Sequence, residues 1–198
     1  MVWHRRAPLR LSHFPVEVTP ATSVSFHDGF LDPRPEGTHL AIDISAPEGT
    51  WVRAAVGGTV LRRWVSGRGP VPGVGWTDRG GYIATLLDAE GYVHYYAHML
   101  DEPRLRPGQL IRAGERIGQV SNTGRHGPMH LHYQVWPVGQ DRDEEVAELT
   151  FHMRFAPAVN PYDELRRLAG TMGASLGRGV QFHATTCAEG PTLASPGA

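Results

Sequence analysis

Lysine is absent from the 198-residue sequence, in which all 19 basic residues are arginine. Without an amine side chain, Schiff-base chemistry and carrier modules that hold a cofactor on a swinging lysine are excluded. Cysteine is scarce as well, because Cys187 is the single one. It can form no intramolecular disulfide, and a thiolate zinc site is excluded too. Any bound metal must therefore be held by nitrogen and oxygen atoms.

Long apolar runs and basic clusters are also missing. No stretch approaches the roughly 20 apolar residues that span a bilayer, so we expect no membrane span. The N-terminal residues carry positive charge but have no apolar core behind it, so no signal peptide is recognisable. The net charge is -1, from 19 basic and 20 acidic residues, which disfavours nucleic acid as a partner. The oligomeric state stays open.

Short runs of β-branched and aromatic residues, separated by Gly, Pro, Asp and Asn, fill residues 16–138. This pattern predicts a mainly β fold, and the length fits one domain. The expected strands are residues 40–44, 51–55, 59–65, 82–87, 92–99, 116–120 and 129–136. Residues 66–78 are too rich in Gly and Pro for an interior strand, so we expect a long loop there.

The composition changes after Gly139. The acidic stretch in residues 139–159 is interpreted as a solvated loop or a helix start. The sequence "NPYDELRRL" predicts one short C-terminal helix, with Asn160 as its N-cap and Pro161 at the first helical position. We therefore expect three parts: an N-terminal extension (1–19), a domain (20–165) and a disordered tail (170–198). The motifs of the domain are concentrated in residues 20–138.

Histidine is abundant, with eleven residues, and three groups fall in expected strands. They are "GTHLAID" with His39 and Asp43, "YVHYYAHM" with His94 and His98, and "MHLHY" with His130 and His132. Strand alternation places His94, Tyr96 and His98 on one face of their strand, and His130 and His132 on one face of theirs. A His-x-His pair can supply two metal ligands, or one ligand and one residue that reaches beyond the metal. The spacing leaves both open.

The pair His39 and Asp43 is harder to place. In an extended strand their Cα atoms would be about 13 Å apart. If both bind one metal, the backbone between them must bend, or one must lie in the preceding loop; the alternative is a strand-end histidine and a turn aspartate. Together, the groups offer two neutral nitrogens and one carboxylate, which suit a zinc site with an open position for a water. The remaining histidines would move protons or stabilise an oxyanion, which predicts a hydrolase.

The motifs His-x-x-x-Asp, Tyr-x-His and His-x-His occur in order within residues 37–60, 91–99 and 130–135, with glycine-rich hairpins at 106–125. In this respect the sequence resembles the lysostaphin-type, LytM-like zinc endopeptidases, which cut peptide bonds in bacterial peptidoglycan. The resemblance implies an antiparallel β fold, sandwich-like or barrel-like, with a groove over the sheet for an extended peptide. It also implies an envelope or extracellular site of action.

Carried over to this chain, the resemblance implies that His39, Asp43 and His132 hold one zinc ion. His98 and His130 resemble the two histidines that flank the attacking water and the scissile carbonyl. Two departures concern the groove: Met129 separates "GP" from "HLH", and residues 20–38 contain no tyrosine that could help to hold an oxyanion.

Three alternatives compete with this interpretation. One is a catalytically silent module that binds or regulates cell-wall enzymes, although every expected ligand position is filled. Another is a zinc hydrolase for a different substrate class. A biotinyl or lipoyl carrier, suggested by the hairpin at residues 108–118, has no lysine for its arm. Which peptidoglycan bond would be cut is left open by the sequence.

Overall fold

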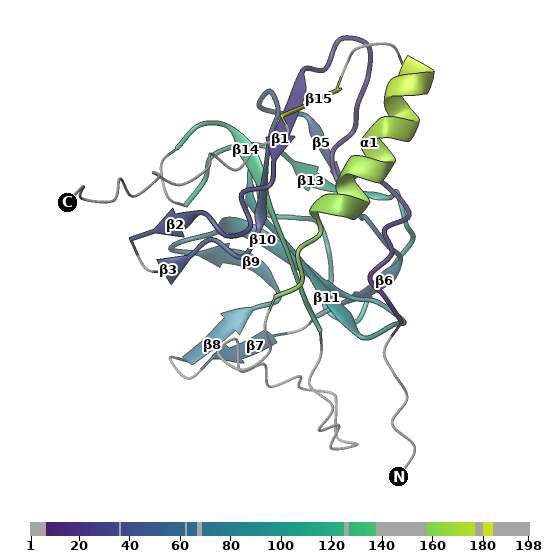
Figure 1. The fold of residues 1–198 in the computed structure, drawn as a ribbon. Coiled ribbons are helices and arrows are strands. Elements are labelled where there is room, and N and C mark those ends of the chain that lie inside the picture. The colour runs from purple at the N-terminus through teal and green to yellow at the C-terminus, as the bar shows by residue number, and fades with distance from the viewer. Residues whose placement is uncertain are drawn as a thin grey trace, which may run out of the picture.

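One large sheet dominates the computed structural model, which describes residues 7–35, 37–61, 63–66, 69–124, 127–137, 158–176 and 180–183 (Figure 1). In spatial order its strands are β12 (Leu110–Ile111), β6 (Gly58–Val60), β10 (Gly81–Leu87), β11 (Tyr92–Met99), β14 (His130–Pro137), β4 (Ile42–Ser45), β1 (Val24–His27) and β15 (Val180–His183). A further strand, β9 (Val74–Thr77), pairs with β10. All these pairs are antiparallel except β1 with β15, which is parallel.

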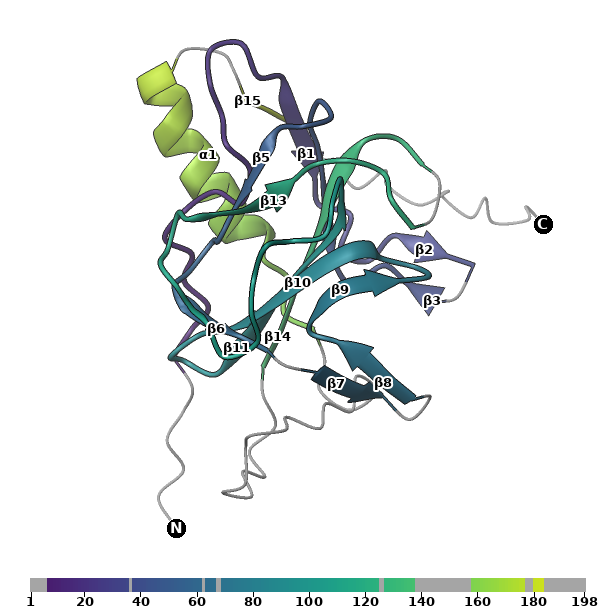
Figure 2. The same ribbon diagram turned by 180° about the vertical axis from the view of Figure 1, so that it is seen from behind.

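Three two-stranded units and one helix complete the described fold. The units pair β2 (Pro33–Arg34) with β3 (Gly37–Thr38), β5 (Trp51–Arg53) with β13 (Arg116–Gln119), and β7 (Arg63–Ser66) with β8 (Gly69–Pro72). The helix is α1 (Tyr162–Leu176). Figures 1 and 2 show the β2–β3 hairpin projecting on the side away from α1. The expected mainly β, antiparallel fold with one C-terminal helix is thus confirmed.

Alternation along β14 explains how the central strand serves both the core and a solvent-facing surface. Leu131, Tyr133 and Val135 point into the hydrophobic core and have no exposed surface. The alternate residues His130 and His132 are partly exposed and line a cavity. Burial of large apolar side chains on one face is the main stabilising term for such a sheet, and it fixes which face the histidines occupy.

The C-terminal part is more ordered than expected. Asn160 caps α1, because its Oδ1 accepts a hydrogen bond from the Tyr162 N–H at 2.9 Å. The helix continues to Leu176, and β15 pairs with β1, where both views place it beside α1 (Figures 1 and 2). The expectation of disorder from residue 170 onward is therefore wrong for these residues. Residues 184–198 lie outside the described part of the chain.

The N-terminal segment is also part of the domain. Leu11, Phe14 and Val16 are buried in the same core as β1 and β14. The segment is held to α1 by Glu164, whose Oε2 accepts from the Leu11 N–H at 3.0 Å, and by Arg167, which donates to the Leu11 carbonyl at 2.7 Å. A boundary at residue 19, between an N-terminal extension and the domain, would thus divide a single hydrophobic core. The contacts that hold it to the helix are with residues about 150 positions later in the chain, which no local pattern indicates.

Residues 66–78, expected to form a loop, contain strands instead. β8 forms a hairpin with β7, and β9 adds an edge to β10. Gly and Pro are tolerated here because these are peripheral strands rather than interior ones. Within the described residues, no helix is long and apolar enough to cross a membrane.

Candidate metal centre and active site

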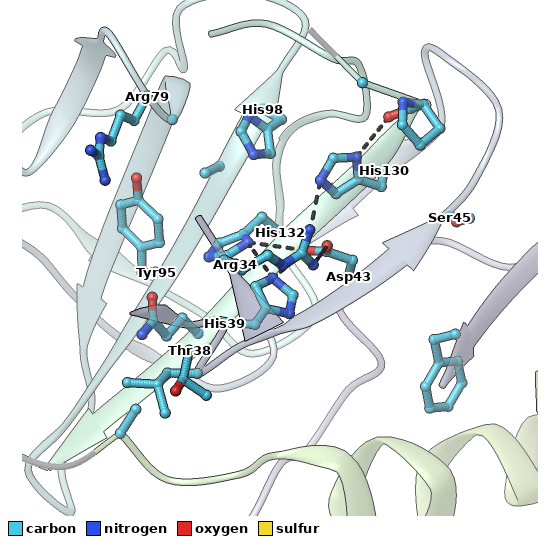
Figure 3. A pocket seen from close by; sticks show the side chains of 18 of the residues that line it. Arg34, Thr38, His39, Asp43, Ser45, Arg79, Tyr95, His98, His130 and His132 are labelled. Carbon is cyan, nitrogen blue, oxygen red and sulfur yellow. Dashed lines mark hydrogen bonds and ion pairs between the residues drawn. The ribbon is translucent and has the colours of Figure 1, made fainter. Parts of the chain in front are cut away.

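The sequence-predicted site residues meet over three adjacent strands. In the register of the sheet, His132 of β14 lies opposite Asp43 of β4 on one side and Ala97 of β11 on the other. The face of β14 that carries His130 and His132 forms the floor of a cavity of about 840 Å³ (Figure 3). The cavity therefore lies over the middle of the sheet, where rigid strands position the side chains.

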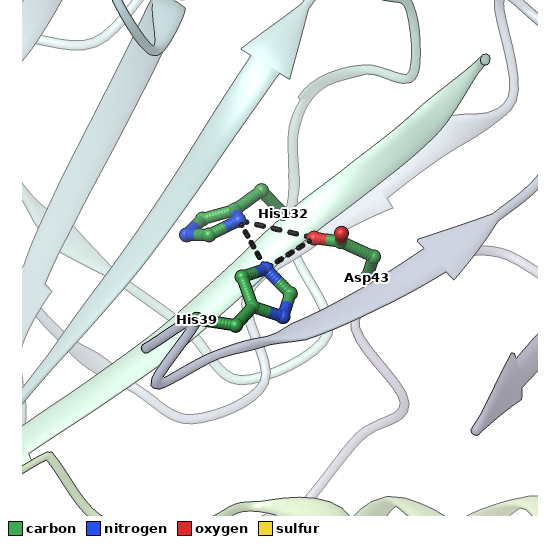
Figure 4. A group of neighbouring side chains, drawn as sticks. All are labelled: His39, Asp43 and His132. Atoms are coloured by element: carbon green, nitrogen blue, oxygen red, sulfur yellow. Dashed lines mark hydrogen bonds and ion pairs between the residues drawn. The ribbon is translucent and has the colours of Figure 1, made fainter. Parts of the chain in front are cut away.

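His39, Asp43 and His132 bring three possible ligand atoms to one point (Figure 4). The Asp43 Oδ1 atom lies 3.0 Å from His39 Nε2 and 3.0 Å from His132 Nδ1, and the two nitrogens are 3.2 Å apart. Tetrahedral ligands at the zinc distances of about 2.0 to 2.2 Å are about 3.3 to 3.6 Å apart. The three atoms are thus close to the spacing that one zinc ion requires, and their chemistry suits it.

A bend at Leu40 brings His39 to Asp43. Leu40 has a positive φ of 55°, and its N–H donates to the Phe30 carbonyl at 2.8 Å. The His39 Nδ1 atom lies 3.0 Å from the Gly29 carbonyl. Because a carbonyl only accepts, Nδ1 carries the proton, and Nε2 presents its lone pair to the cluster. Of the two possibilities that the spacing left open, the structure therefore shows a bend, supplied by a left-handed residue directly after the histidine.

Asp43 is ionised in this surrounding. Burial raises the pKa of its carboxyl, but the adjacent polar groups of His132 and His39 outweigh that effect and lower the pKa well below its ordinary value. Its second oxygen, Oδ2, accepts a hydrogen bond from Arg34 Nη2 at 2.9 Å. The carboxylate is thus available in the charged form that binds a metal.

His98 lies on the same face as His130 and His132, and not on the face of His94 and Tyr96 as alternation predicted. The pairing of β11 with β10 shifts between Tyr96 and Met99, and His98 has a positive φ of 62°. Such a bulge turns the side chain to the other face of the strand. The expected alternation therefore fails at His98, because one extra residue in β11 breaks the period of two.

His98 and His130 form a pair beside the ligand cluster, with ring centroids 4.8 Å apart. The Nδ1 atom of His98 donates to the Thr123 carbonyl at 2.8 Å, and that of His130 donates to the Pro128 carbonyl at 2.7 Å. Burial lowers the pKa of His98 to about 4. Because Nδ1 is the donor in both rings, each ring in its neutral form offers Nε2 as an acceptor. The Nε2 atom of His130 lies 3.7 Å from Asp43 Oδ1.

His94 takes no part in the site. Its ring is fully buried on the core face, where Nε2 lies 3.0 Å from Asp88 Oδ2 and Nδ1 lies 2.7 Å from the Tyr133 hydroxyl. Since the Asp88 carboxylate only accepts, Nε2–H donates to it, and a neutral ring accepts the Tyr133 O–H. The histidine is a structural residue of the core.

Three residues of the cavity were missed by sequence reasoning. Tyr95 shares the site face with His98, since the bulge reverses the alternation, and its ring meets that of His132 edge-on with centroids 6.0 Å apart. Burial raises the pKa of Tyr95 to about 12. Arg34 and Arg79 also line the cavity. Arginines in a Pro- and Gly-rich hairpin and in a turn are typical of solvated loops, so no pattern identified them.

Comparison with known proteins agrees with this geometry. The family model described as Peptidase family M23 matches residues 37–144. The DD-carboxypeptidase/endopeptidase Mpg of Neisseria meningitidis is 35% identical over 104 residues, which are 52% of this chain and 21% of that protein. The L-Ala--D-Glu endopeptidase of Bacillus subtilis is 27% identical over 165 residues, 77% of this chain and 42% of that protein. The chain thus spans less than half the length of either relative.

A solved structure shares the fold. A putative glycyl-glycine endopeptidase lytM from Ruminococcus gnavus superimposes with a TM-score of 0.56 at 19% sequence identity, covering 89% of this chain and 64% of that one. At that identity the likeness concerns the fold alone. The family match extends over more than half of the chain and includes His39, Asp43, His98, His130 and His132.

Proposed function

The chain belongs to peptidase family M23, and from this premise we propose that it is a zinc-dependent endopeptidase that hydrolyses peptide bonds in the cross-links or bridges of bacterial peptidoglycan. The observation that carries the proposal is the convergence of His39 Nε2, Asp43 Oδ1 and His132 Nδ1 within 3.2 Å of one another. Two further histidines stand beside this cluster with acceptor nitrogens.

The donor set supports zinc as the cofactor. Two imidazole nitrogens and one carboxylate oxygen are the ligands of many catalytic zinc sites, which keep a position open. Bound there, zinc would polarise the carbonyl to be cut and activate the attacking water. The backbone carbonyl of Gly29 holds the His39 ring in the tautomer that ligation needs. Asp43, as the one carboxylate of the set, balances part of the ion's charge.

His130 and His98 are the proposed catalytic residues. The His130 Nε2 atom is proposed to take a proton from the attacking water and to return it to the leaving amine, as a general base and then a general acid. Its Nδ1–H bond to the Pro128 carbonyl keeps Nε2 free for this task. The His98 Nε2 atom, fixed through Thr123, is proposed to orient the water by accepting its second hydrogen. Once protonated, either ring could stabilise the oxyanion.

The substrate assignment rests on the relatives and on the cavity. The names of the two relatives denote a DD-carboxypeptidase/endopeptidase and an L-Ala--D-Glu endopeptidase. We infer an analogous peptide substrate here, which places the action in the cell envelope or outside the cell. The cavity lies along the face of β14 that carries His130 and His132, and we propose that an extended peptide binds there over the histidines. The proposed peptidase domain, expected from its motifs at residues 20–165, is extended by the packed N-terminal segment before residue 20 and by β15.

The test is digestion of purified peptidoglycan with the purified chain. We expect new peptide fragments in mass spectra of the released muropeptides, about one zinc per chain by metal analysis, and loss of cleavage after treatment with a chelator. Added zinc should restore the activity. Well-folded protein that binds no zinc and releases no fragment in its presence would favour a silent binding module instead.

A further inference from the structure

Gln134 of β14 carries a buried amide that has no partner in the described part of the chain. Only 9% of the residue is exposed, and no described residue forms a hydrogen bond with its side chain. The other buried polar residues Thr85, His94 and Ser121 each form a side-chain hydrogen bond of 2.7 to 2.9 Å. Because an amide buried without partners is destabilising, we expect a group that enters the cavity to satisfy it.

The amide belongs to a part of the cavity beyond the ligand cluster. Gln134 lies two residues after His132 on the same face of β14, about 7 Å further along the strand. Residues of this face line the cavity from His130 to Trp136, over about 20 Å. In the register of the sheet Gln134 lies opposite Tyr95, which Figure 3 shows on the side of His132 away from His130. The cavity thus has room for several residues of an extended peptide.

The surroundings hold the backbone of Gln134 in place and carry no formal charge beside it. Its neighbours in the chain, Tyr133 and Val135, are fully buried in the core, and the Val159 N–H donates to the Val135 carbonyl at 2.9 Å. The Tyr95 ring, which is uncharged, packs against Trp136 with ring centroids 5.6 Å apart. A neutral ligand group therefore suits this position better than an ion.

We propose that Gln134 is an anchor for the substrate backbone, whose amide forms hydrogen bonds with a peptide group two residues from the bond to be cut. The inference rests on the proposed function and specifies how its site holds the substrate. A glutamine amide offers donors and an acceptor, which match the C=O and N–H of a peptide group. Equivalent groups of an extended peptide are also about 7 Å apart, so a scissile bond at the ligand cluster places one of them over Gln134.

The first test uses a synthetic cross-linked stem peptide and two ester analogues. Each analogue has an ester oxygen in place of one peptide N–H, two residues before or two residues after the bond that the zinc-loaded protein cleaves. For one of the two, kcat/KM should be roughly 3- to 10-fold lower, mainly through a higher KM, because one neutral hydrogen bond is lost. In Gln134→Met, which removes the amide but keeps the length of the side chain, that ester should be cleaved as well as the peptide.

Because each ratio of peptide to ester is taken within one protein, a loss of zinc or of stability in a variant cancels. Gln109→Met is the matched control, since Gln109 lies outside the cavity, where its Oε1 accepts from the Arg106 N–H at 2.9 Å. It should keep the wild-type ratios. If neither ester is a poorer substrate than the peptide, or if the difference persists unchanged in Gln134→Met, the anchor is wrong while the proposed function stands.

A second measurement, by nuclear magnetic resonance, needs no hydrolysis. In isotope-labelled zinc-free protein, the side-chain amide signals of Gln134 are identified by their absence in Gln134→Met. Added stem peptide should shift these signals and slow the exchange of their protons with water, whereas the signals of Gln109 should not change. If the peptide is not cleaved, this measurement decides: shifted Gln134 signals support the anchor although the peptidase proposal fails, and unchanged signals overturn both.

Discussion

The Nε2 atom of His39 lies 3.0 Å from Oδ1 of Asp43, across a single left-handed residue, Leu40. Leucine in this conformation costs roughly 1 to 2 kcal/mol relative to an ordinary backbone. The surrounding hydrogen bonds maintain it, including His39 N–H to the Asp32 carbonyl at 3.0 Å. Strain of this kind is typical of sites in which the geometry of the ligands matters more than local stability.

The first prediction concerns Leu40→Ile, which keeps every atom of the side chain but branches it at Cβ. A β-branched residue tolerates a positive φ poorly, so the turn should open and separate His39 from Asp43. We expect unfolding of the zinc-free protein to cost about 1 to 2 kcal/mol less, and zinc affinity to fall roughly 10-fold. Urea unfolding and competition with a zinc-binding dye measure the two effects.

Leu110→Ile is the matched control, because Leu110 is a 78% exposed strand residue with an ordinary backbone. It should change neither quantity. Wild-type zinc affinity in Leu40→Ile would show that the left-handed turn does not set the ligand geometry.

Much of this site could be predicted from the sequence because its residues lie on strands, where alternation holds over several residues. His130 and His132 share a face of β14 as the pattern required, with Leu131 and Tyr133 in the core. For the convergence of His39 on Asp43, the spacing left open a bend or a ligand in the preceding loop, and it did not indicate Leu40 as the residue that bends. Leucine is not a residue that signals a left-handed turn.

The errors arose where a local irregularity or a distant contact decided the outcome. His94 and His98 were placed on one face, and the bulge in β11, which has no glycine or proline, separated them. The order of Val180–His183 depends on pairing with β1, about 150 residues earlier in the chain. Arg34 and Arg79 enter the cavity only through tertiary structure. Such contacts have no periodic pattern.

The second prediction separates metal binding from proton transfer on one strand. His132→Ala should weaken zinc binding by more than about 100-fold, beyond the range for residues that only support a ligand. His130→Ala should retain zinc and lower kcat roughly 100- to 10,000-fold, the usual contribution of a general base. Metal content of the dialysed proteins and hydrolysis of a peptidoglycan peptide measure the two properties. Loss of zinc in His130→Ala, with retention in His132→Ala, would reverse the assignment of the two histidines.

The third prediction tests the N-terminal segment as part of the domain. Phe14 packs on Phe26 of β1 with ring centroids 5.5 Å apart, and Phe26 packs on Tyr162 of α1 at 5.8 Å. Phe14→Ala should therefore destabilise the protein by about 3 to 5 kcal/mol, although the residue lies outside the family match. Thermal and urea unfolding measure this. Leu110→Ala should stay within about 0.5 kcal/mol of wild type, and an equally small effect of Phe14→Ala would contradict the packing.

The fourth prediction concerns the pH dependence of the buried Asp88–His94–Tyr133 chain. Burial raises the pKa of Asp88, but hydrogen bonds from His94 and from the Tyr92 N–H prevail and hold the folded-state pKa below the ordinary value of 3.8. The folded state therefore binds fewer protons than the unfolded state near this pH. The resulting stabilisation is complete above about pH 4 and is lost as the pH falls through the folded pKa.

Asp88→Asn removes this charge, so the variant should be about 1 to 3 kcal/mol less stable than wild type at neutral pH. The difference should shrink as the pH is lowered toward 3, because wild type then protonates Asp88 and loses the same interaction. Urea unfolding of both zinc-free proteins between about pH 3 and 7 measures the difference, in which the titration of other carboxylates cancels. Asp101→Asn, at an exposed position, should follow wild type throughout. A stability difference that stays constant over this range would mean that Asp88 has the same pKa in the folded and unfolded states, and the hydrogen bonds to His94 and Tyr92 would then not favour its charged form.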